Sequence, residues 1–446
     1  MISNSSHSSA KVVKFGGSSL ADANQFLKVK SIIESDPTRV YVIPSAPGKR
    51  FDGDTKVTDM LLSCYDSYGT ENFDTIFNNI CDRYNGIIKD LGLDISLEED
   101  YETIIKTISA GCKKDYVASR GEYLNGKILA KLLGFNFVDA ADIIIFDNDG
   151  KFNATATDKC AGSKLKSMSN AVIPGFYGAK PDGTVKTFSR GGSDITGAII
   201  ARAVMADIYE NWTDVSGFLM CDPRIVKDAK QIGVITYREL RELSYMGATV
   251  LHEDSIFPVK LAGIPINIRN TNIPTDEGTM IVASSRCKTI VNDDVITGIA
   301  GKKGFSVINI EKDMMNQELG VGYRVLQVLT EMKISFEHLP SGIDTMSVVV
   351  FKDAIKGREK EIMDRITAAV NPDSIDIESN LALIAVVGRG MIRATGTASR
   401  IFTAVAKEGI NIRMIDQGSS ELNIIIGVDE SDFENTVRTI YTEFVK

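Results

Sequence analysis

Short apolar runs alternate with longer amphipathic stretches through the first part of the chain. The run at 11–15, KVVKF, meets two glycines and then a stretch with helical spacing, SLADANQFLKVKSII. A second apolar run at 40–43 precedes a loop rich in proline and glycine from Pro44 to Asp54, and mainly helical sequence follows to about Lys114. The alternation continues through FNFVDA, DIIIF, AVIPGF, a helix expected from Ser193 to Met205, and DIYENW. This pattern predicts an α/β domain with a largely parallel sheet between helices.

The pattern changes near residues 284–294, where SSRCKTIVNDD has the composition of a linker. Beyond it, KISFEHLPSGIDTMSVVV and GINIRMIDQGSSELNIIIGV resemble each other, and each follows an amphipathic helix. Ile334 and Ile410 occupy equivalent places, 76 positions apart. The sequence therefore predicts two copies of a small βαββαβ unit.

The second copy lacks a closing strand, because its last helix, DFENTVRTIYTEF, is followed by only two residues. We expect the spare strand VITGIA at 295–300 to fill that edge, which would interleave the two units. The expected divisions are a disordered serine-rich tail at 1–10, a catalytic domain at 11–290, a linker and joining strand at 291–303, and small units at 304–375 and 376–446.

Composition excludes several classes of protein. Fifty Lys and Arg against 59 Asp and Glu give a formal charge of −9, which argues against nucleic acid or an anionic membrane as the main partner. No apolar run is long enough for a membrane helix, and the start has no signal-peptide pattern, so we expect a cytoplasmic protein. The six cysteines are scattered, with no C-x-x-C pair and only three histidines, so we expect free thiols and no protein-held metal.

The first candidate motif is Lys14-Phe15-Gly16-Gly17-Ser18-Ser19 at the end of the first strand. Glycines let the backbone approach an anion, the following helix start presents unpaired N–H groups, and lysine adds a full positive charge. The motif therefore suits phosphate, although a glycine pair after a strand is also common in simple tight turns.

A second cluster, TFSRGGSD at 187–194, precedes the helix expected from Ser193. Arg190 can bind a carboxylate through two parallel hydrogen bonds, although it could equally cap the turn. Between the two clusters lies SRGE, whose Glu122 is either an ordinary first-turn helix residue or a ligand for an ammonium group. Finally, WTDVSGF with DPR soon after follows a strand, where it could hold a nucleotide or form a plain loop.

The joint occurrence and order of VVKFGGSS, SRGE, PGFYG, TFSRGGSD, WTDVSGF and DPRIV resemble the aspartokinases of the amino acid kinase superfamily. The C-terminal repeat, with VVGRGM and GTASRIF, looks like the tandem ACT domains of that family. The resemblance implies that Lys14 contacts the transferring phosphoryl group, that Asp194 orients Lys14, and that Glu122 and Arg190 meet the ammonium and α-carboxylate of aspartate. It implies an aspartate site of Ser45, Thr58, Glu122, Phe176, Thr187, Arg190 and Ser193. It implies an ATP site of Lys14, Gly16, Gly17, Ser18, Thr213, Asp214 and Arg224, with Mg²⁺ carried by the ATP phosphates.

Two positions depart from the family pattern. A lysine usual in G-A-K-V-L-H-P is Thr249 here, and a tyrosine common before D-P-R corresponds to Leu219. The first change removes a positive charge expected near the phosphates, so either Lys14 and Mg²⁺ suffice or a nearby lysine such as Lys227 or Lys260 substitutes. We expect these changes to alter the affinity for the nucleotide more than the identity of the substrate.

The implied reaction needs no general base, because a carboxylate nucleophile is already anionic. A glutamate, acetylglutamate or carbamate kinase of the same superfamily is one alternative, and an amino-acid sensor without turnover is another. The resemblance further implies feedback inhibition by lysine, with threonine possible, through a homodimer or dimer of dimers formed by the ACT units. The implied effector site is Met315, Glu318, Gly320, Val321, Gly322, Ser335, Phe336 and Glu337. Glu318 and Glu337 suit the side-chain ammonium of lysine, although they could be solvated surface carboxylates.

Overall fold

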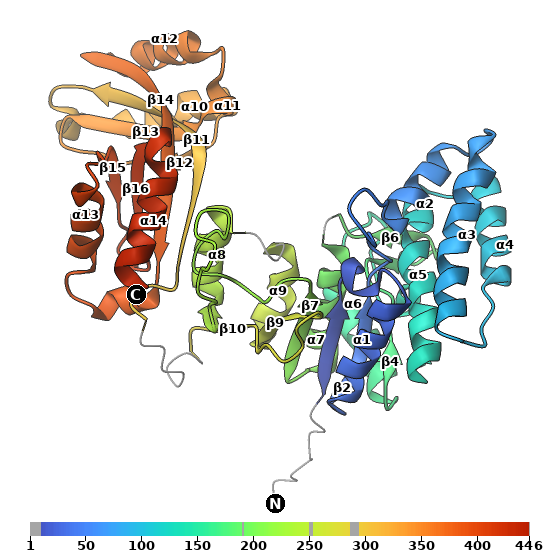
Figure 1. Cartoon of the computed structure of the whole chain (residues 1–446). Helices are drawn as coiled ribbons and strands as arrows, with labels where there is room; N and C mark the ends of the chain where they lie inside the picture. The colour runs from blue at the N-terminus through green and yellow to red at the C-terminus, as the bar shows by residue number, and fades with distance from the viewer. Residues whose placement is uncertain (1–9, 190, 249–252, 286–293, 446) are drawn as a thin grey trace, which may run out of the picture. The chain divides into compact units, whose positions relative to one another are not determined.

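The computed structural model describes residues 10–189, 191–248, 253–285 and 294–445 (Figure 1). The chain folds into two compact units. The first contains the described residues up to Phe218, Gln231–Tyr237 and the described part of 250–291. The second contains Leu219–Lys230, the described part of 238–249 and the C-terminal region. Two short segments from the middle of the sequence therefore pack with the C-terminal region.

The first unit is built on an eight-stranded sheet of order β3-β4-β2-β1-β7-β9-β10-β8. The strands are β1 (Lys11–Phe15), β2 (Arg39–Pro44), β3 (Asn136–Phe137), β4 (Ala171–Val172), β7 (Ile208–Thr213), β8 (Val234–Thr236), β9 (Ile266–Asn270) and β10 (Thr279–Val282). Every described neighbour pair is parallel except β9 with β10. The largely parallel sheet predicted from the sequence is confirmed.

Helices cover this sheet, and four of them gather into a bundle at one end of the unit (Figure 1). The bundle consists of α2 (Val57–Asp66), α3 (Asn72–Asp90), α4 (Glu98–Ser109) and α5 (Lys114–Leu133). The other helices are α1 (Ala23–Glu34), α6 (Ala154–Lys166), α7 (Gly192–Val204) and α9 (Glu253–Ala262), and β5 (Tyr177–Ala179) pairs with β6 (Val185–Thr187) in a separate ribbon.

The central strand β1 shows why the sequence folds this way. Val13 and Phe15 are fully buried in the apolar core that α1, α3 and α5 share. Because side chains alternate along a strand, Lys14 points to the opposite face, where it meets the start of α7. A charged residue in a largely apolar strand is thereby placed at a helix N-terminus.

One expectation about local structure is wrong. The sequence pattern puts Glu122 at a helix start, but α5 begins eight residues earlier, at Lys114, and Glu122 lies in its buried interior. Gly121 does not interrupt the helix. It clears space instead, since a Cβ there would lie 2.8 Å from the Cβ of Ala46 in the loop after β2. The glycine allows that loop to pack directly on α5.

The second unit contains a six-stranded antiparallel sheet of order β12-β13-β11-β14-β16-β15. Its strands are β11 (Gly298–Glu311), β12 (Phe336–His338), β13 (Thr345–Phe351), β14 (Ser374–Val387), β15 (Met414–Asp416) and β16 (Asn423–Asp429). Its helices are α8 (Tyr237–Tyr245), α10 (Val321–Glu331), α11 (Lys352–Ile355), α12 (Glu359–Val370), α13 (Thr397–Lys407) and α14 (Phe433–Phe444).

The spare strand fills the edge as predicted, although it begins at Gly298 rather than Val295. It is continuous with the first strand of the first copy, so that β11 serves both copies. Its early part pairs with β14 at Gly298 and Val387, while its later part pairs with β13 at Ser306 and Val350. Likewise, β14 closes the first copy and opens the second, and the predicted interleaving is confirmed.

Helix α8 is held by the second unit through a buried carboxylate. Glu239 is fully buried and accepts hydrogen bonds from Thr297 Oγ1 at 2.6 Å and from the Arg389 backbone at 3.0 Å. Because an unpaired buried charge is strongly unfavourable, these donors fix α8 on the C-terminal region.

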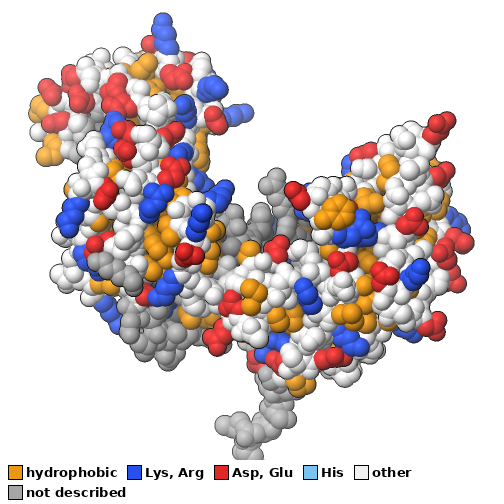
Figure 2. Space-filling view, viewed as in Figure 1, with side chains coloured by type: hydrophobic (Ala, Val, Ile, Leu, Met, Phe, Trp, Pro, Cys, Tyr) orange, Lys and Arg blue, Asp and Glu red, His pale blue; other side chains and the backbone are white. Residues whose placement is uncertain are grey.

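None of the described helices has the length and apolar character needed to cross a membrane. Figure 2 shows acidic and basic side chains interspersed over the face it presents.

Candidate active site

Several of the predicted catalytic and ATP-site residues, Lys14, Gly16 and Thr213 among them, lie where the central strands of the first unit end. β1 lies between β2 and β7 and is parallel to both, so the carboxyl ends of all three strands open at the same edge of the sheet. The chain runs from β1 to β2 on one side and later returns to β7 on the other. Ligands of open α/β sheets bind at such a reversal of strand order.

Lys14 lies at the centre of this edge. Its Nζ is 2.6 Å from Asp194 Oδ1 in the first turn of α7 and 3.4 Å from Asn211 Oδ1 on β7. Asn211 Nδ2 in turn donates to Asp194 Oδ1 at 2.8 Å. The Lys14 side chain is only 9% exposed, so the ammonium is held in place by two partners rather than by water. This contact is the one that the predicted role of Asp194, the orientation of Lys14, would require.

The glycine turn follows directly. The Gly16 N–H donates to Trp212 O at 3.0 Å, which ties the turn to β7, and Ser19 N–H donates back to Gly16 O. The backbone donors that the turn can offer an anion are therefore those of Gly17 and Ser18, at the start of the short helix η1 (Gly17–Leu20). Lys14 Nζ lies 3.6 Å from the place where a Gly16 side chain would begin.

The loop after β2 carries Ser45 past two buried polar groups of α5. Glu122 is 5% exposed and Asn125 is fully buried, and they lie one helical turn apart. Asn125 Nδ2 donates to Ser45 O at 2.7 Å, and the Ala46 N–H hydrogen-bonds to the Glu122 carboxylate. Glu122 Oε2 and Asn125 Oδ1 have no hydrogen-bond partner among the described residues. Two buried acceptors are thus available for a ligand with N–H donors.

Burial also changes the charge state of Glu122. Desolvation raises the pKa of its carboxyl to about 8, although backbone hydrogen bonds from Ala46 and Glu122 itself and the charge of Arg120 act in the opposite direction. A bound cation would favour the ionised form and so reverse part of this shift.

The backbone beside Phe176 packs closely on α7, since a Cβ on Gly175 would lie 2.6 Å from Ser193 Cβ. Phe176 has a φ of 83°, a left-handed conformation that is unusual for a bulky residue. It is held there because its N–H donates to Thr196 Oγ1 at 3.0 Å and its O accepts from Phe188 N–H at 2.9 Å. A side chain on Gly192 would lie 2.3 Å from the Phe176 ring, so only glycine fits at the start of α7.

A cavity of about 640 Å³ joins three of the predicted aspartate residues, Thr58, Phe176 and Thr187. Asp115, at the start of α5, accepts hydrogen bonds from the Thr187 hydroxyl, from Thr187 N–H at 3.2 Å and from Lys186 Nζ at 3.1 Å. Burial alone would raise the pKa of Asp115, but these donors hold it below its usual value. Asp115 therefore fixes the orientation of Thr187 at the cavity wall.

The other predicted residues have different surroundings. Thr213 ends β7 and donates to Asp214 Oδ1 at 3.1 Å. Arg224 belongs to the second unit, where its side chain is 88% exposed and pairs with Asp222 at 2.6 Å. Leu219 also belongs to the second unit. Arg190 and Thr249 lie outside the described residues.

The implied effector residues lie on two elements of the first ACT-like copy. Met315 is buried in the short helix η4 (Met315–Gln317), while Gly320, Val321 and Gly322 form the start of α10. Glu318 forms ion pairs with Lys312 at 3.1 Å and with Arg324. An effector ammonium would have to compete with these two cations for Glu318.

The second effector stretch follows α10. Ser335 precedes β12, and Phe336 and Glu337 belong to it. The Glu337 carboxylate accepts a hydrogen bond from Tyr245 Oη at the end of α8. Nothing in the sequence pattern indicates this partner.

Sequence reasoning missed Asn125, Asn211 and Asp115. Asn125 follows Glu122 at i+3, a spacing that places both on one face of a helix once α5 is extended to Lys114. Asn211 lies beside Glu210 and Thr213 in the mixed polar and apolar strand β7, so its polarity does not single it out. Asp115 gives no signal, because its partner Thr187 is 72 positions away.

Comparisons with known proteins agree with this arrangement. Residues 9–270 match the amino acid kinase family and residues 384–444 match an ACT domain. Aspartokinase 3 of Bacillus subtilis is 40% identical over 97% of this chain and 98% of its own length. The chain belongs to the amino acid kinase family, among the aspartokinases. It is therefore a phosphotransferase, with an ACT domain as its C-terminal module.

Solved structures of aspartokinases share the fold. The aspartate kinase of Clostridium acetobutylicum matches with a TM-score of 0.90 and 52% identity, over 97% of this chain and all of that one. Escherichia coli aspartokinase III, solved with aspartate and ADP, matches with a TM-score of 0.71 and 23% identity, over 98% of this chain and all of that one. A second structure of that protein, with lysine and aspartate, has a TM-score of 0.72 at the same identity and the same coverage.

Proposed function

We propose that this aspartokinase transfers the γ-phosphoryl group of ATP to the β-carboxylate of L-aspartate and forms β-aspartyl phosphate, the first step of lysine, threonine and methionine biosynthesis. The observation that favours an amino acid with a free ammonium as the substrate is the pair of buried acceptors, Glu122 Oε2 and Asn125 Oδ1, next to Ser45. An α-ammonium group has three N–H donors and a charge that Glu122 can neutralise. A substrate with a free ammonium would thus satisfy both groups.

The chain's own residues supply positioning and positive charge. The attacking carboxylate is already ionised at neutral pH, so the reaction requires no group to remove a proton. Its difficulty is that two anions must approach in line. Lys14, held by Asp194 and Asn211, places a fixed cation at the end of β1, and the Gly17 and Ser18 amides add donors for phosphate oxygens.

Mg²⁺ would arrive with the ATP phosphates. Three side chains with oxygen atoms lie near this edge of the sheet: Asp194 in the first turn of α7, Thr213 at the end of β7, and Asp214 directly after it. Carboxylate and hydroxyl oxygens are hard ligands, which suit Mg²⁺. The metal would neutralise charge on the phosphates when bound. Thr213 is the last residue of the strand that carries Asn211, and Asp214 follows it, which supports their proposed contact with the nucleotide.

The decisive experiment is a hydroxylamine-trapping assay for acyl phosphate with ATP, Mg²⁺ and a panel of acceptors. We expect L-aspartate to be phosphorylated and L-glutamate, N-acetylglutamate and carbamate to react at least 100-fold more slowly. N-Acetylglutamate and carbamate lack the free ammonium that Glu122 and Asn125 would bind. If glutamate or another acceptor were preferred, the substrate assignment would be wrong, and no turnover with any acceptor would favour a sensor.

We further propose feedback inhibition by lysine through a homodimer or dimer of dimers built on the first ACT-like copy. The described residues of that copy expose several large apolar side chains: Met314 at 59%, Leu319 at 94%, Tyr323 at 71% and Ile343 at 68%. Large exposed apolar groups suit an interface between subunits. Static light scattering with and without lysine tests the oligomeric state. A titration of the acyl-phosphate assay with lysine and with threonine tests the feedback inhibition.

A further inference from the structure

Arg83 is a buried arginine of α3 whose guanidinium contacts three separate parts of the first unit. Its side chain is 5% exposed. Nη2 donates to Gly48 O at 2.7 Å and to Ala21 O at 3.0 Å, and Nη1 donates to Asp54 Oδ2 at 2.9 Å. Ala21 directly follows the phosphate turn and its short helix, whereas Gly48 and Asp54 belong to the loop that carries Ser45. One side chain therefore joins the segment proposed to hold the nucleotide to the segment proposed to hold the substrate.

The two segments also touch directly. The Gly48 N–H donates to Gly17 O at 2.8 Å, and a Cβ on Gly48 would lie 2.6 Å from the carbonyl carbon of Gly17. A Cβ on Gly17 would lie 2.9 Å from Ala46 O. The turn and the loop thus form a glycine-to-glycine contact in which neither backbone has room to move closer. Arg83 binds both sides of this contact through backbone carbonyls.

We propose that Arg83 is a positioning residue that sets the separation between the phosphate turn and the substrate loop. The proposal rests on the proposed function, because it takes the turn to hold the phosphates of ATP and the loop to hold aspartate. Phosphoryl transfer depends on the in-line placement of two bound anions, and a displacement of about 1 Å can lower a rate about 100-fold. A planar guanidinium with several fixed donors can span three acceptors, whereas an ammonium cannot hold the same geometry.

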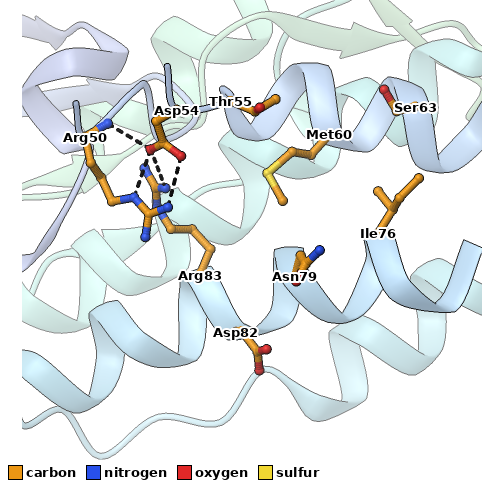
Figure 3. A pocket seen from close by; sticks show the side chains of 9 residues that line it. All are labelled: Arg50, Asp54, Thr55, Met60, Ser63, Ile76, Asn79, Asp82 and Arg83. Atoms are coloured by element: carbon orange, nitrogen blue, oxygen red, sulfur yellow. Dashed lines mark hydrogen bonds and ion pairs between the residues drawn. The ribbon is translucent and has the colours of Figure 1, made fainter. Parts of the chain in front are cut away.

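The neighbouring Arg50 provides a matched control. Figure 3 shows Arg50 and Arg83 converging on the carboxylate of Asp54 from the loop and from α3. Arg50 Nε and Nη2 bond to Asp54 at 2.8 and 3.0 Å, but its side chain is 44% exposed and its guanidinium reaches toward Asp54 rather than toward Gly48 or Ala21. Loss of Arg50 removes one charge from the same carboxylate without releasing either of those carbonyls.

The first test compares Arg83→Gln and Arg83→Lys with Arg50→Gln under saturating substrates. We expect both Arg83 variants to lose about 10- to 100-fold in kcat, with KM for ATP and aspartate changed by less than about threefold. Arg50→Gln should stay within about twofold of the wild type. A purely structural role would instead lower the folded fraction and leave kcat per folded molecule unchanged, so circular dichroism and active-site titration accompany the kinetics.

A cavity makes a second, sharper test practicable. It has a volume of about 560 Å³ and is lined by Arg83 and Arg50 together with Asp54, Met60, Asn79 and other residues of α2 and α3 (Figure 3). Guanidinium ion can enter such a space. We expect millimolar guanidinium to raise kcat of Arg83→Ala at least fivefold, whereas methylammonium should not, and Arg50→Ala should respond to neither.

Hydrogen–deuterium exchange without substrates separates this proposal from the proposed function. In Arg83→Gln, amides of residues 16–21 and 45–54 should exchange faster together, while those of β7 remain protected. If the wild type phosphorylated no aspartate but this coupled exchange appeared, the function would fail and the positioning would stand. Full kcat in folded Arg83→Gln, or unchanged exchange in both segments, would overturn the role of Arg83.

Discussion

The Nζ atom of Lys14 lies 2.6 Å from Oδ1 of Asp194, an ion pair that joins the central strand to the first turn of α7. The same carboxylate oxygen accepts a hydrogen bond from Asn211. The cation is therefore held by groups on both of its neighbours, α7 and β7. Preorganised charge of this kind stabilises a transition state without reorganisation during the reaction.

Lys14→Met should fold and be almost inactive. Removal of a cation at a transferring phosphoryl group lowers the rate on the order of 10³-fold or more. Lys11→Met is the control, since Lys11 lies on the same strand but pairs with Asp36 and Glu210 instead. Steady-state kinetics decide the matter: more than about a tenth of wild-type kcat in Lys14→Met would contradict the assignment.

Asn211→Leu should lower kcat about tenfold and leave both KM values within about twofold. The substitution keeps the size of the side chain but removes the donor to Asp194, so Lys14 would lose its fixed position while keeping its charge. The measurement is kcat with both substrates saturating. An increase in the aspartate KM at unchanged kcat would instead place Asn211 in direct contact with the substrate.

Affinity for aspartate should depend on pH through Glu122. Because burial raises the pKa of its carboxyl to about 8, the free site is mostly protonated at pH 6 and must lose a proton to pair with an ammonium. The apparent aspartate KM should therefore fall about tenfold per pH unit from pH 6 and level off near pH 8. Glu122→Gln should lose this slope and weaken aspartate binding at pH 8 by about 2 to 4 kcal/mol. A slope that survives in Glu122→Gln would assign the titration to another group.

Asn125→Leu should weaken aspartate about tenfold while leaving succinate, tested as a competitive inhibitor, within about twofold. Succinate has both carboxylates but no ammonium, so it makes no use of the Asn125 Oδ1 acceptor. The ratio of the aspartate KM to the succinate inhibition constant is the relevant measurement. Equal weakening of both ligands would mean that Asn125 only supports the Ser45 loop.

Regulation can be tested at the contact between Tyr245 and Glu337. If lysine binds Glu337 through its ammonium, it competes with the Tyr245 hydroxyl. Tyr245→Phe should then lower the lysine concentration for half inhibition about three- to tenfold, whereas Glu337→Ala should abolish inhibition. A lysine titration at subsaturating aspartate measures both. Unchanged inhibition in Glu337→Ala would move the effector away from β12.

The sequence was sufficient for features governed by local pattern. The KVVKF strand with its glycine turn, the helix that begins near Ser193 and the C-terminal repeat all lie where the pattern of residues predicts. It was insufficient where the interacting residues are far apart in the chain. Glu239 depends on Thr297 and Arg389, which are 58 and 150 positions further along the chain, so nothing near α8 shows that this helix belongs with the C-terminal region.

The candidate site divides in the same way. The pairing of Lys14 with Asp194 could be expected in advance, because the resemblance of their two motifs to those of a known family implies it. Asn125 and Arg83 could not, because they lie in ordinary amphipathic helices and acquire their roles from a loop that packs on them. The raised pKa of Glu122 likewise follows from its depth in α5, which depends on how closely Gly121 lets that loop approach.

The sharing of β11 and β14 between the two ACT-like copies limits how this module can be exchanged between proteins. Each strand contributes one half of its length to each copy. A genetic exchange with its break point between the two copies would therefore leave each copy with an unpaired sheet edge. The smallest segment that recombination can transfer intact runs from the start of β11 to the end of α14.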